Sequence, residues 1–187
     1  MSICPWAERE PERTYHDTEW GVPVHDDRVL FEFITLEGAQ AGLSWSTILN
    51  KREGYRRAFC NWEIEKIARL NARSVERLVN DASIVRHRGK IESTIGNAKA
   101  ALRLIDEHGS LDAYLWQFVE CKPIVNRFKA MADVPTKTEV SDTMSKALKQ
   151  AGFKFVGSTI CYAFMQATGM VNDHLVGCAR FKEMGEG

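Results

Sequence analysis

The sequence lacks the features of membrane-embedded and exported proteins. It contains no uninterrupted run of about 18 apolar residues, the length that a membrane-spanning helix needs. Its first residues, from Met1 to Trp6, have neither the basic end nor the apolar run of a secretory signal. Its five cysteines are odd in number and irregularly spaced, which does not fit a disulfide framework. We therefore expect a cytoplasmic protein with no membrane association.

The chain also lacks net charge. Its 25 basic residues are balanced by 25 acidic ones, so no overall positive field indicates a nucleic-acid partner. Such a partner would have to be bound through a local concentration of positive charge. The 187 residues are enough for one hydrophobic core, and they include neither a linker-like segment nor an internal repeat. We expect a single unit over residues 1–187.

Strand-like alternation of apolar residues is missing as well, whereas helical spacing occurs along most of the chain. Residues 27–41 and 44–59 are two such segments. Ser44, Ser74 and Ser141 are candidate N-caps, because their side chains can accept hydrogen bonds from the first free N–H groups of a helix. The sequence therefore predicts an all-α protein.

The stretch from Leu36 to Trp45 has a carboxylate and a large aromatic side chain near the two ends of a run of small residues. Glu37 continues the spacing of one predicted helix, and Gly42 interrupts it before the next helix begins near Trp45. Glycine at such a bend lets another molecule approach the backbone closely. Two interpretations are open. Glu37 and Trp45 form the walls of a pocket, or the stretch is an ordinary helix corner with Trp45 in the core and Glu37 in solvent.

Cysteine and histidine occur near both ends of the chain. Cys4 and His16 lie near the N-terminus, and His174 and Cys178 lie near the C-terminus. Two thiolates and two imidazoles make a closed tetrahedral set for zinc, which would be structural because no position is left for water. The alternatives are buried residues without a metal, or a Cys4–Cys178 disulfide, which a reducing compartment disfavours.

A basic turn joins two predicted helices near residues 74–100 in the outline of a helix-hairpin-helix. Such a unit presents backbone N–H groups and a helix N-terminus to phosphates, which suits DNA binding without base readout. Although the net charge of the chain is zero, this turn has a local positive charge from Arg86, His87, Arg88 and Lys90. The alternative is an exposed basic turn between two core helices.

Taken together, several segments resemble the 3-methyladenine DNA glycosylase I family, in the same order and over nearly the whole chain. These segments are Tyr15–Pro23, Leu36–Trp45, Ile84–Ile91, Phe153–Tyr162 and Val171–His174. The resemblance implies a helix-hairpin-helix glycosylase fold in which a structural zinc joins segments 4–16 and 174–178 through the four cysteine and histidine residues. It also implies that the protein flips 3-methyladenine out of alkylated double-stranded DNA and excises it hydrolytically. The product would be an abasic site with no strand cleavage, and we expect a monomer.

The resemblance also implies roles for individual side chains. Glu37 would be the catalytic carboxylate that hydrogen-bonds the flipped base, and Trp45 would stack on that base. Three aromatic residues would line the rest of the pocket: Tyr15, Trp6 and Trp20. Gly42 and Leu43 would fill the gap that the base leaves in the duplex. The basic residues of the hairpin would contact the DNA backbone.

Two positions depart from the family pattern. Members often have a second tyrosine upstream of Tyr15, whereas this chain has Glu12–Thr14 there, with one residue fewer. Ser83 stands where the hairpin often has glycine, and a positive φ at that position would cost serine about 1 kcal/mol. Neither Asp106 nor Asp112 is assigned the aspartate role of other helix-hairpin-helix glycosylases.

These residue types suit the chemistry. Methylation at N3 gives the adenine nucleoside a positive charge, so the base departs as a neutral molecule. An indole offers such a cation a stacking energy of about 0.5–2 kcal/mol, and a carboxylate accepts a charge-assisted hydrogen bond. A zinc-stabilised DNA-binding module without catalysis and a zinc hydrolase are the alternatives. The first does not need Glu37 and Trp45 in one pocket, and the second needs a dispensable metal ligand.

Overall fold

The computed structural model describes residues 3–185, and most of them lie in α-helices. The helices are α1 (Glu12–Thr18), α2 (Asp27–Gln40), α3 (Trp45–Ala58), α4 (Ile64–Ala68), α5 (Ala72–Leu78), α6 (Arg88–His108), α7 (Leu111–Trp116), α8 (Glu139–Gln150), α9 (Ser158–Ala167) and α10 (Ala179–Gly185). The short 3-10 turns are η1 (Pro5–Ala7), η2 (Cys60–Trp62), η3 (Gln117–Val119) and η4 (Met131–Asp133). The all-α prediction is confirmed.

The described chain also contains a pair of strands that the sequence did not indicate. Strand β1 (Ile124–Val125) pairs in parallel with β2 (Val171–Asn172). Each strand has only two residues, which is too short to show an alternating pattern in the sequence. The pair ties the segment before α8 to the segment after α9.

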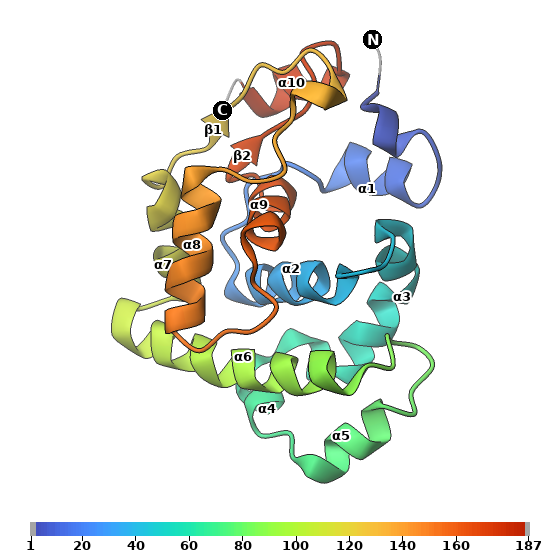
Figure 1. The fold of residues 1–187 in the computed structure, drawn as a ribbon, viewed down its shortest axis with the longest axis vertical. Helices are drawn as coiled ribbons and strands as arrows, with labels where there is room; N and C mark the ends of the chain where they lie inside the picture. The colour runs from blue at the N-terminus through green and yellow to red at the C-terminus, as the bar shows by residue number, and fades with distance from the viewer. Residues whose placement is uncertain (1–2, 186–187) are drawn as a thin grey trace.

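Helix α2 lies at the centre of the molecule, with α6 below it and α9 above it in the view of Figure 1. Every residue from Leu30 to Ala39 is buried. The helix begins at a strong cap, because the Asp26 carboxylate accepts the N–H groups of Arg28 and Val29 at 2.9 and 3.0 Å. Since α2 is surrounded by other helices, its C-terminal part, which includes Glu37, lies inside the protein.

Two of the three predicted helix caps are wrong by one turn. Ser44 caps α3 as expected. Helix α5, however, is capped by Asn71 rather than Ser74, and α8 is capped by Thr138 rather than Ser141. Both serines are the third residue of their helix, where a short polar side chain also occurs next to the free N–H groups. Each predicted start was therefore three residues too late.

The predicted hairpin consists of α5, the connection 79–87 and α6. The connection packs against α3: Lys51 Nζ donates to the Ala82 carbonyl at 2.7 Å, and the Ser83 backbone lies against Gly54, where a Cβ atom would clash. Ser83 is not among the residues with positive φ, so serine carries no backbone penalty there. The backbone strain that a positive φ would have imposed on Ser83 is therefore absent.

Segments from both ends of the chain meet at one end of the molecule, where α1 and α10 lie near each other in Figure 1. Cys4, Leu175 and Cys178 form a small buried cluster separate from the main core. Within residues 3–185, no helix is both long and apolar enough to cross a lipid bilayer.

Candidate functional site

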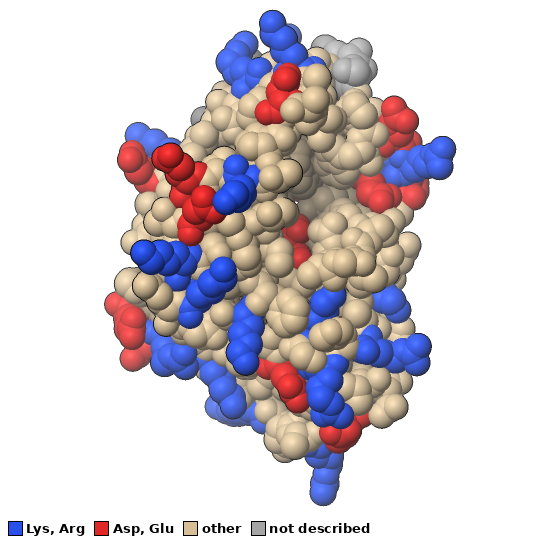
Figure 2. Space-filling model, in the orientation of Figure 1, with Lys and Arg blue, Asp and Glu red and all other residues tan. Residues whose placement is uncertain are grey.

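A cavity of about 200 Å³ opens between the N-terminal helices and α9. Figure 2 shows the molecule hollowed on this face, with acidic atoms inside the hollow. The cavity is lined by Trp6, Tyr15, Trp20, Glu37, Gln40, Trp45, Met131, Val134, Ala163, Gln166 and Asp173. The structure thus brings the sequence-predicted carboxylate and all four predicted aromatic residues to one place.

Glu37 reaches the cavity from the buried C-terminal part of α2 and is 5% exposed. Within the described chain, its carboxyl group has no hydrogen-bond or ion-pair partner. Burial raises the pKa of Glu37 to about 8, because a charged carboxylate loses its hydration there. The helix-corner interpretation, which put Glu37 in solvent, is therefore wrong. Burial thus favours the protonated form of this carboxyl group.

Two more polar groups in the cavity walls lack partners. The Tyr15 hydroxyl and the Trp45 indole N–H are buried and have no hydrogen-bond partner within the described residues. Their rings lie 5.4 Å apart between centroids. A buried polar group without a partner costs about 1–3 kcal/mol, so a ligand with hydrogen-bonding edges would be stabilised by supplying the missing partners.

Trp6 and Trp20 form the aromatic side of the cavity that faces the end of the molecule. Their rings meet edge to face at 4.9 Å. The Trp20 ring also lies 4.6 Å from that of His174, and Trp6 lies 5.4 Å from His16. The position of this wall therefore depends on the predicted metal-binding histidines behind it.

The structure brings the four predicted metal ligands together, and all four are buried. Their donor atoms lie within 4.8 Å of one another. The His16 Nε2–His174 Nδ1 distance is 3.1 Å, and Cys178 Sγ lies 3.5 Å from the first nitrogen and 3.8 Å from the second. Cys4 Sγ lies 3.9 Å from His174 Nδ1. Tetrahedral zinc with two sulfur and two nitrogen ligands separates its donors by about 3.3–3.8 Å, so the cluster fits this ion.

The outer nitrogens of the two histidines also fit a metal site. His16 Nδ1 lies 2.8 Å from the Asp17 carboxylate, and His174 Nε2 lies 3.1 Å from the Trp20 carbonyl. Both partners are acceptors, so each outer nitrogen carries the proton and each inner nitrogen presents a lone pair to the cluster. Two facing lone pairs repel each other unless a cation lies between them. The arrangement could therefore hold a metal ion.

The predicted DNA-binding residues of the hairpin lie apart from the cavity and differ in their surroundings. Arg86 makes no hydrogen bond or ion pair within the described chain, whereas Arg88 pairs with Glu76 at 2.8 Å. The His87 side chain caps α6 by accepting the Lys90 N–H at 3.1 Å. Of the two arginines, only Arg86 has a guanidinium without a partner inside the protein.

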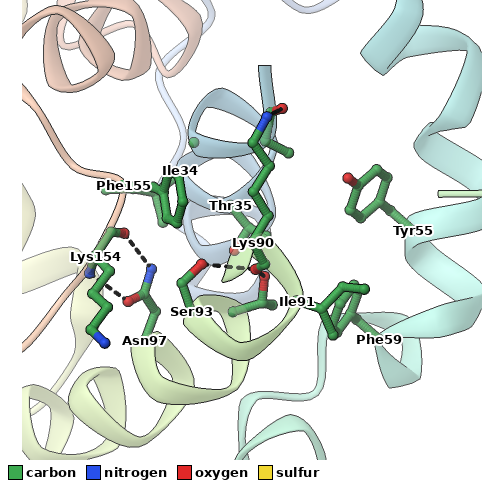
Figure 3. A pocket seen from close by; sticks show the side chains of 13 residues that line it. Ile34, Thr35, Tyr55, Phe59, Lys90, Ile91, Ser93, Asn97, Lys154 and Phe155 are labelled. Carbon is green, nitrogen blue, oxygen red and sulfur yellow. Dashed lines mark hydrogen bonds between the residues drawn. The ribbon is translucent and has the colours of Figure 1, made fainter. Parts of the chain in front are cut away.

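The Lys90 ammonium is bound within the protein. Its Nζ donates to the carbonyls of Ala39 and Ala41 at 2.8 and 2.7 Å, and burial lowers the pKa of this lysine. Figure 3 shows its side chain extending along α2, beside a crevice of about 10 Å³ between α2, α3 and α6. This crevice is too small for a ligand. Lys90 therefore caps the C-terminal end of α2 by hydrogen bonding to its last carbonyl groups, which was not expected from the sequence.

Gly42 and Leu43 form the turn between α2 and α3. Gly42 has a φ of 80°, a backbone conformation that glycine adopts without strain. Leu43 is 41% exposed, which is unusual for a leucine in this protein. They lie two and three positions after the cavity residue Gln40, which ends α2.

The sequence did not single out several cavity residues. Met131 and Val134 come from η4 and the segment after it, and Ala163 and Gln166 come from α9. These residues are distant in sequence from the others, and no local pattern marks them. Asp173 belongs to Val171–His174, one of the segments that resemble the family, but that resemblance implies no role for it. Residues Glu12–Thr14, the departure from the family pattern, do not line the cavity.

Comparisons with known proteins agree with this geometry. A family model described as methyladenine glycosylase matches residues 6–181. The DNA-3-methyladenine glycosylase 1 of Escherichia coli (strain K12) is 52% identical over 95% of this chain and 96% of that protein. The Haemophilus influenzae DNA-3-methyladenine glycosylase is 49% identical over 94% of this chain and 95% of that protein.

Solved structures are similar in fold as well as in sequence. A crystal structure of 3-methyladenine DNA glycosylase I has a TM-score of 0.93 at 49% identity and covers 95% of this chain and 98% of that one. A structure that describes 3-methyladenine recognition by the Staphylococcus aureus protein has a TM-score of 0.92 at 37% identity, with 96% of each chain covered.

Proposed function

The chain belongs to the methyladenine glycosylase family, and we propose that its cavity receives 3-methyladenine flipped out of alkylated double-stranded DNA. The activity of the protein is excision of this base, as in its relatives at 49–52% identity. One observation supports this use of the cavity most strongly. A buried carboxyl without partners, Glu37, shares the cavity with two aromatic residues whose polar atoms are also unpartnered, Tyr15 and Trp45.

The electrostatics of the cavity favour an alkylated purine over a normal one. Methylation at N3 makes the nucleoside cationic, and an aromatic face attracts a cation by about 0.5–2 kcal/mol, which Trp45 would supply. A carboxyl group can accept the exocyclic N–H of the base, and a cation nearby favours its charged form, which Glu37 would adopt on binding. A neutral adenine would gain less from both groups.

The reaction breaks the bond between N9 of the base and C1′ of the sugar. The base leaves with the electron pair of this bond and becomes neutral 3-methyladenine, because it carried the positive charge beforehand. Water adds to C1′ and releases a proton to solvent, so the sugar ends as an abasic site. The step needs little general-acid help, since the leaving group is neutral. Discrimination between bases therefore rests on binding in the cavity.

Base flipping needs contacts outside the cavity. Unstacking a base costs a few kcal/mol, and a side chain that enters the vacated space lowers this cost. Leu43, exposed on the turn beside the cavity, is suited to this role, and Gly42 lets the turn approach DNA closely. The hairpin would contact the phosphate backbone, with Arg86 as its unpaired charge.

We assign zinc to the Cys4, His16, His174 and Cys178 cluster on the donor chemistry described above. The ion would hold the two terminal segments together and keep the Trp6 and Trp20 wall in place. With four protein ligands it has no open position, which argues against a zinc hydrolase. Cavity, hairpin and cluster are all built from one chain, which supports action as a monomer. All five cysteines are free, which supports a reducing cytoplasm.

Release of free base from methylated duplex DNA tests the proposal. We expect Glu37→Gln and Trp45→Ala each to lower the single-turnover rate of 3-methyladenine release by about 10-fold or more, since each removes a contact to the base. Glu92→Gln, on the exposed face of α6, is the matched control and should release the base at the wild-type rate. Wild-type rates in both cavity variants would show that the base binds elsewhere.

A further inference from the structure

Asp173 is a second buried carboxylate in the wall of the cavity. It follows β2, is 2% exposed and lines the same space as Glu37. Its Oδ2 accepts hydrogen bonds from the Tyr162 hydroxyl at 2.6 Å and from Gln166 Nε2 at 2.8 Å. Its Oδ1 accepts from Asn126 Nδ2 at 2.7 Å. Donors therefore hold both oxygens in place.

The three donors of Asp173 are all neutral. A hydroxyl and two amides stabilise a carboxylate by hydrogen bonding, but they do not cancel its charge. No lysine, arginine or histidine nitrogen of the described chain lies within 4.0 Å of the Asp173 oxygens. Glu32, another buried acid, differs in this respect because it is paired with Arg52 at 2.7 Å. Asp173 is thus a buried charge without a counterion.

The two carboxyl groups in the cavity have contrasting surroundings. Glu37 makes no hydrogen bond within the described residues, and burial favours its neutral form. Asp173, by contrast, accepts hydrogen bonds from three donors, and none of its partners is an acceptor. Two carboxyl groups whose environments differ in this way commonly take different roles.

Building on the proposed function, we propose that Asp173 is the fixed negative charge by which the cavity selects a cationic purine over a neutral one. A buried charge without a counterion is costly, and a cation entering the cavity offsets that cost. A neutral purine of the same shape does not. Glu37 then accepts a hydrogen bond from the edge of the base and becomes charged only beside a bound cation, while Asp173 supplies a negative charge that does not depend on the ligand. This assigns specificity to a residue outside the Glu37–Trp45 pair.

A pair of probes separates charge from shape. One is 3,9-dimethyladeninium, a permanent cation that carries a methyl group in place of the sugar. The other is its 3-deaza analogue, in which carbon replaces N3, used at a pH where it is neutral. Binding of each is measured by quenching of tryptophan fluorescence, since Trp6, Trp20 and Trp45 line the cavity. The ratio of the two affinities is the preference for charge.

We expect wild-type protein to prefer the cation. Asp173→Asn keeps the size of the side chain and removes its charge, and we expect it to lower affinity for the cation at least 10-fold and for the neutral analogue less than 3-fold. Tyr162→Phe is the matched control, because it removes a donor and keeps the carboxylate, and it should retain the preference. Equal loss for both probes in Asp173→Asn, or no loss, would overturn the inference.

A second variant decides the matter if Asp173→Asn does not fold. Glu37→Gln leaves Asp173 as the only acidic residue of the described chain that lines the cavity. We expect it to bind both probes more weakly and to keep the preference for the cation. Complete loss of that preference would assign the charge reading to Glu37 instead. Failure of the wild type to bind either probe would contradict the proposed function itself, and not merely the role of Asp173.

Discussion

The cavity and the basic hairpin differ in how their polar groups are satisfied. In the cavity, the Tyr15 hydroxyl, the Trp45 N–H and the Glu37 carboxyl have no partners within the described chain. In the hairpin, Lys90 donates to two carbonyls and Arg88 is paired with Glu76. Unpaired buried groups favour a ligand that completes their hydrogen bonds, whereas paired groups maintain the fold. The comparison therefore places recognition in the cavity and support in most of the hairpin.

The largest effect is expected from a variant that removes structural support from the cavity and leaves the hairpin intact. Cys178→Ser breaks the proposed zinc site, and loss of a structural metal should lower the free energy of unfolding by more than about 3 kcal/mol. Hydrogen exchange should rise in segments 4–20 and 171–181 and stay slow in α6. Wild-type protein should keep one zinc per chain through dialysis.

The exposed Cys121 provides the control for this prediction, because Cys121→Ser changes a thiol outside the cluster. It should retain both the zinc and the stability of the wild type. Unchanged folding of Cys178→Ser together with no bound metal in the wild type would remove the zinc assignment.

A second prediction uses the missing partners of Glu37. Its pKa is raised to about 8 in the folded protein by burial, while the unfolded chain ionises near the ordinary value of 4.5. Between these values the folded state binds the extra proton, so this group lowers the free energy of unfolding as pH rises. Glu37→Gln removes this effect. The free energy of unfolding of the variant relative to the wild type should therefore rise by about 3–4 kcal/mol between pH 5 and pH 8.

Urea unfolding of both proteins at pH 5 and pH 8 measures this difference, and effects of pH on other groups cancel between them. Glu92→Gln, which changes an exposed glutamate, should show no such dependence. A difference that is the same at both pH values would mean that Glu37 is already charged in the folded protein.

A third prediction concerns Lys90, which the sequence suggested as a phosphate contact. Lys90→Met removes two hydrogen bonds at the end of α2 and should lower the free energy of unfolding by about 1–2 kcal/mol. The dependence of DNA affinity on salt should remain unchanged, because the ammonium is engaged inside the protein. A salt slope reduced by about 0.9 would show instead that Lys90 neutralises a phosphate.

The smallest effect is expected from removing Arg86, the hairpin arginine that makes no ion pair within the described chain. Arg86→Ala should weaken binding to undamaged duplexes of any sequence by a few-fold and reduce the salt slope by about 0.9. Arg88→Ala should change the slope less, because Arg88 is already paired with Glu76. Titrations at several salt concentrations measure both variants. A loss confined to particular DNA sequences would indicate base readout rather than phosphate contact.

What the sequence predicted and what it missed have a physical explanation. The all-α fold and the bend at Gly42 depend on local spacing, which is visible along the chain. The starts of α5 and α8 were placed three residues late, because Ser74 and Ser141 are as suitable for a cap as the residues that precede their helices. Helix existence was therefore predicted better than helix boundaries.

The residues that line the cavity were harder to predict than the helices, because tertiary structure brings many of them together. Glu37 and Trp45 are close in sequence and could be paired by inspection, whereas Met131, Gln166 and Asp173 come from segments far from them. The internal role of Lys90 was also invisible, because the carbonyls it binds lie 49 and 51 residues away. Contacts of this kind depend on the packing of α2 against α6 and leave no local pattern.

A crystal structure of the protein with free 3-methyladenine is the most direct test of the assignment of the base to the cavity. We predict that the base lies against the Trp45 ring, with an oxygen of Glu37 within about 3 Å of its exocyclic nitrogen. The base bound at another place, with the cavity between α2 and α9 left empty, would contradict this assignment.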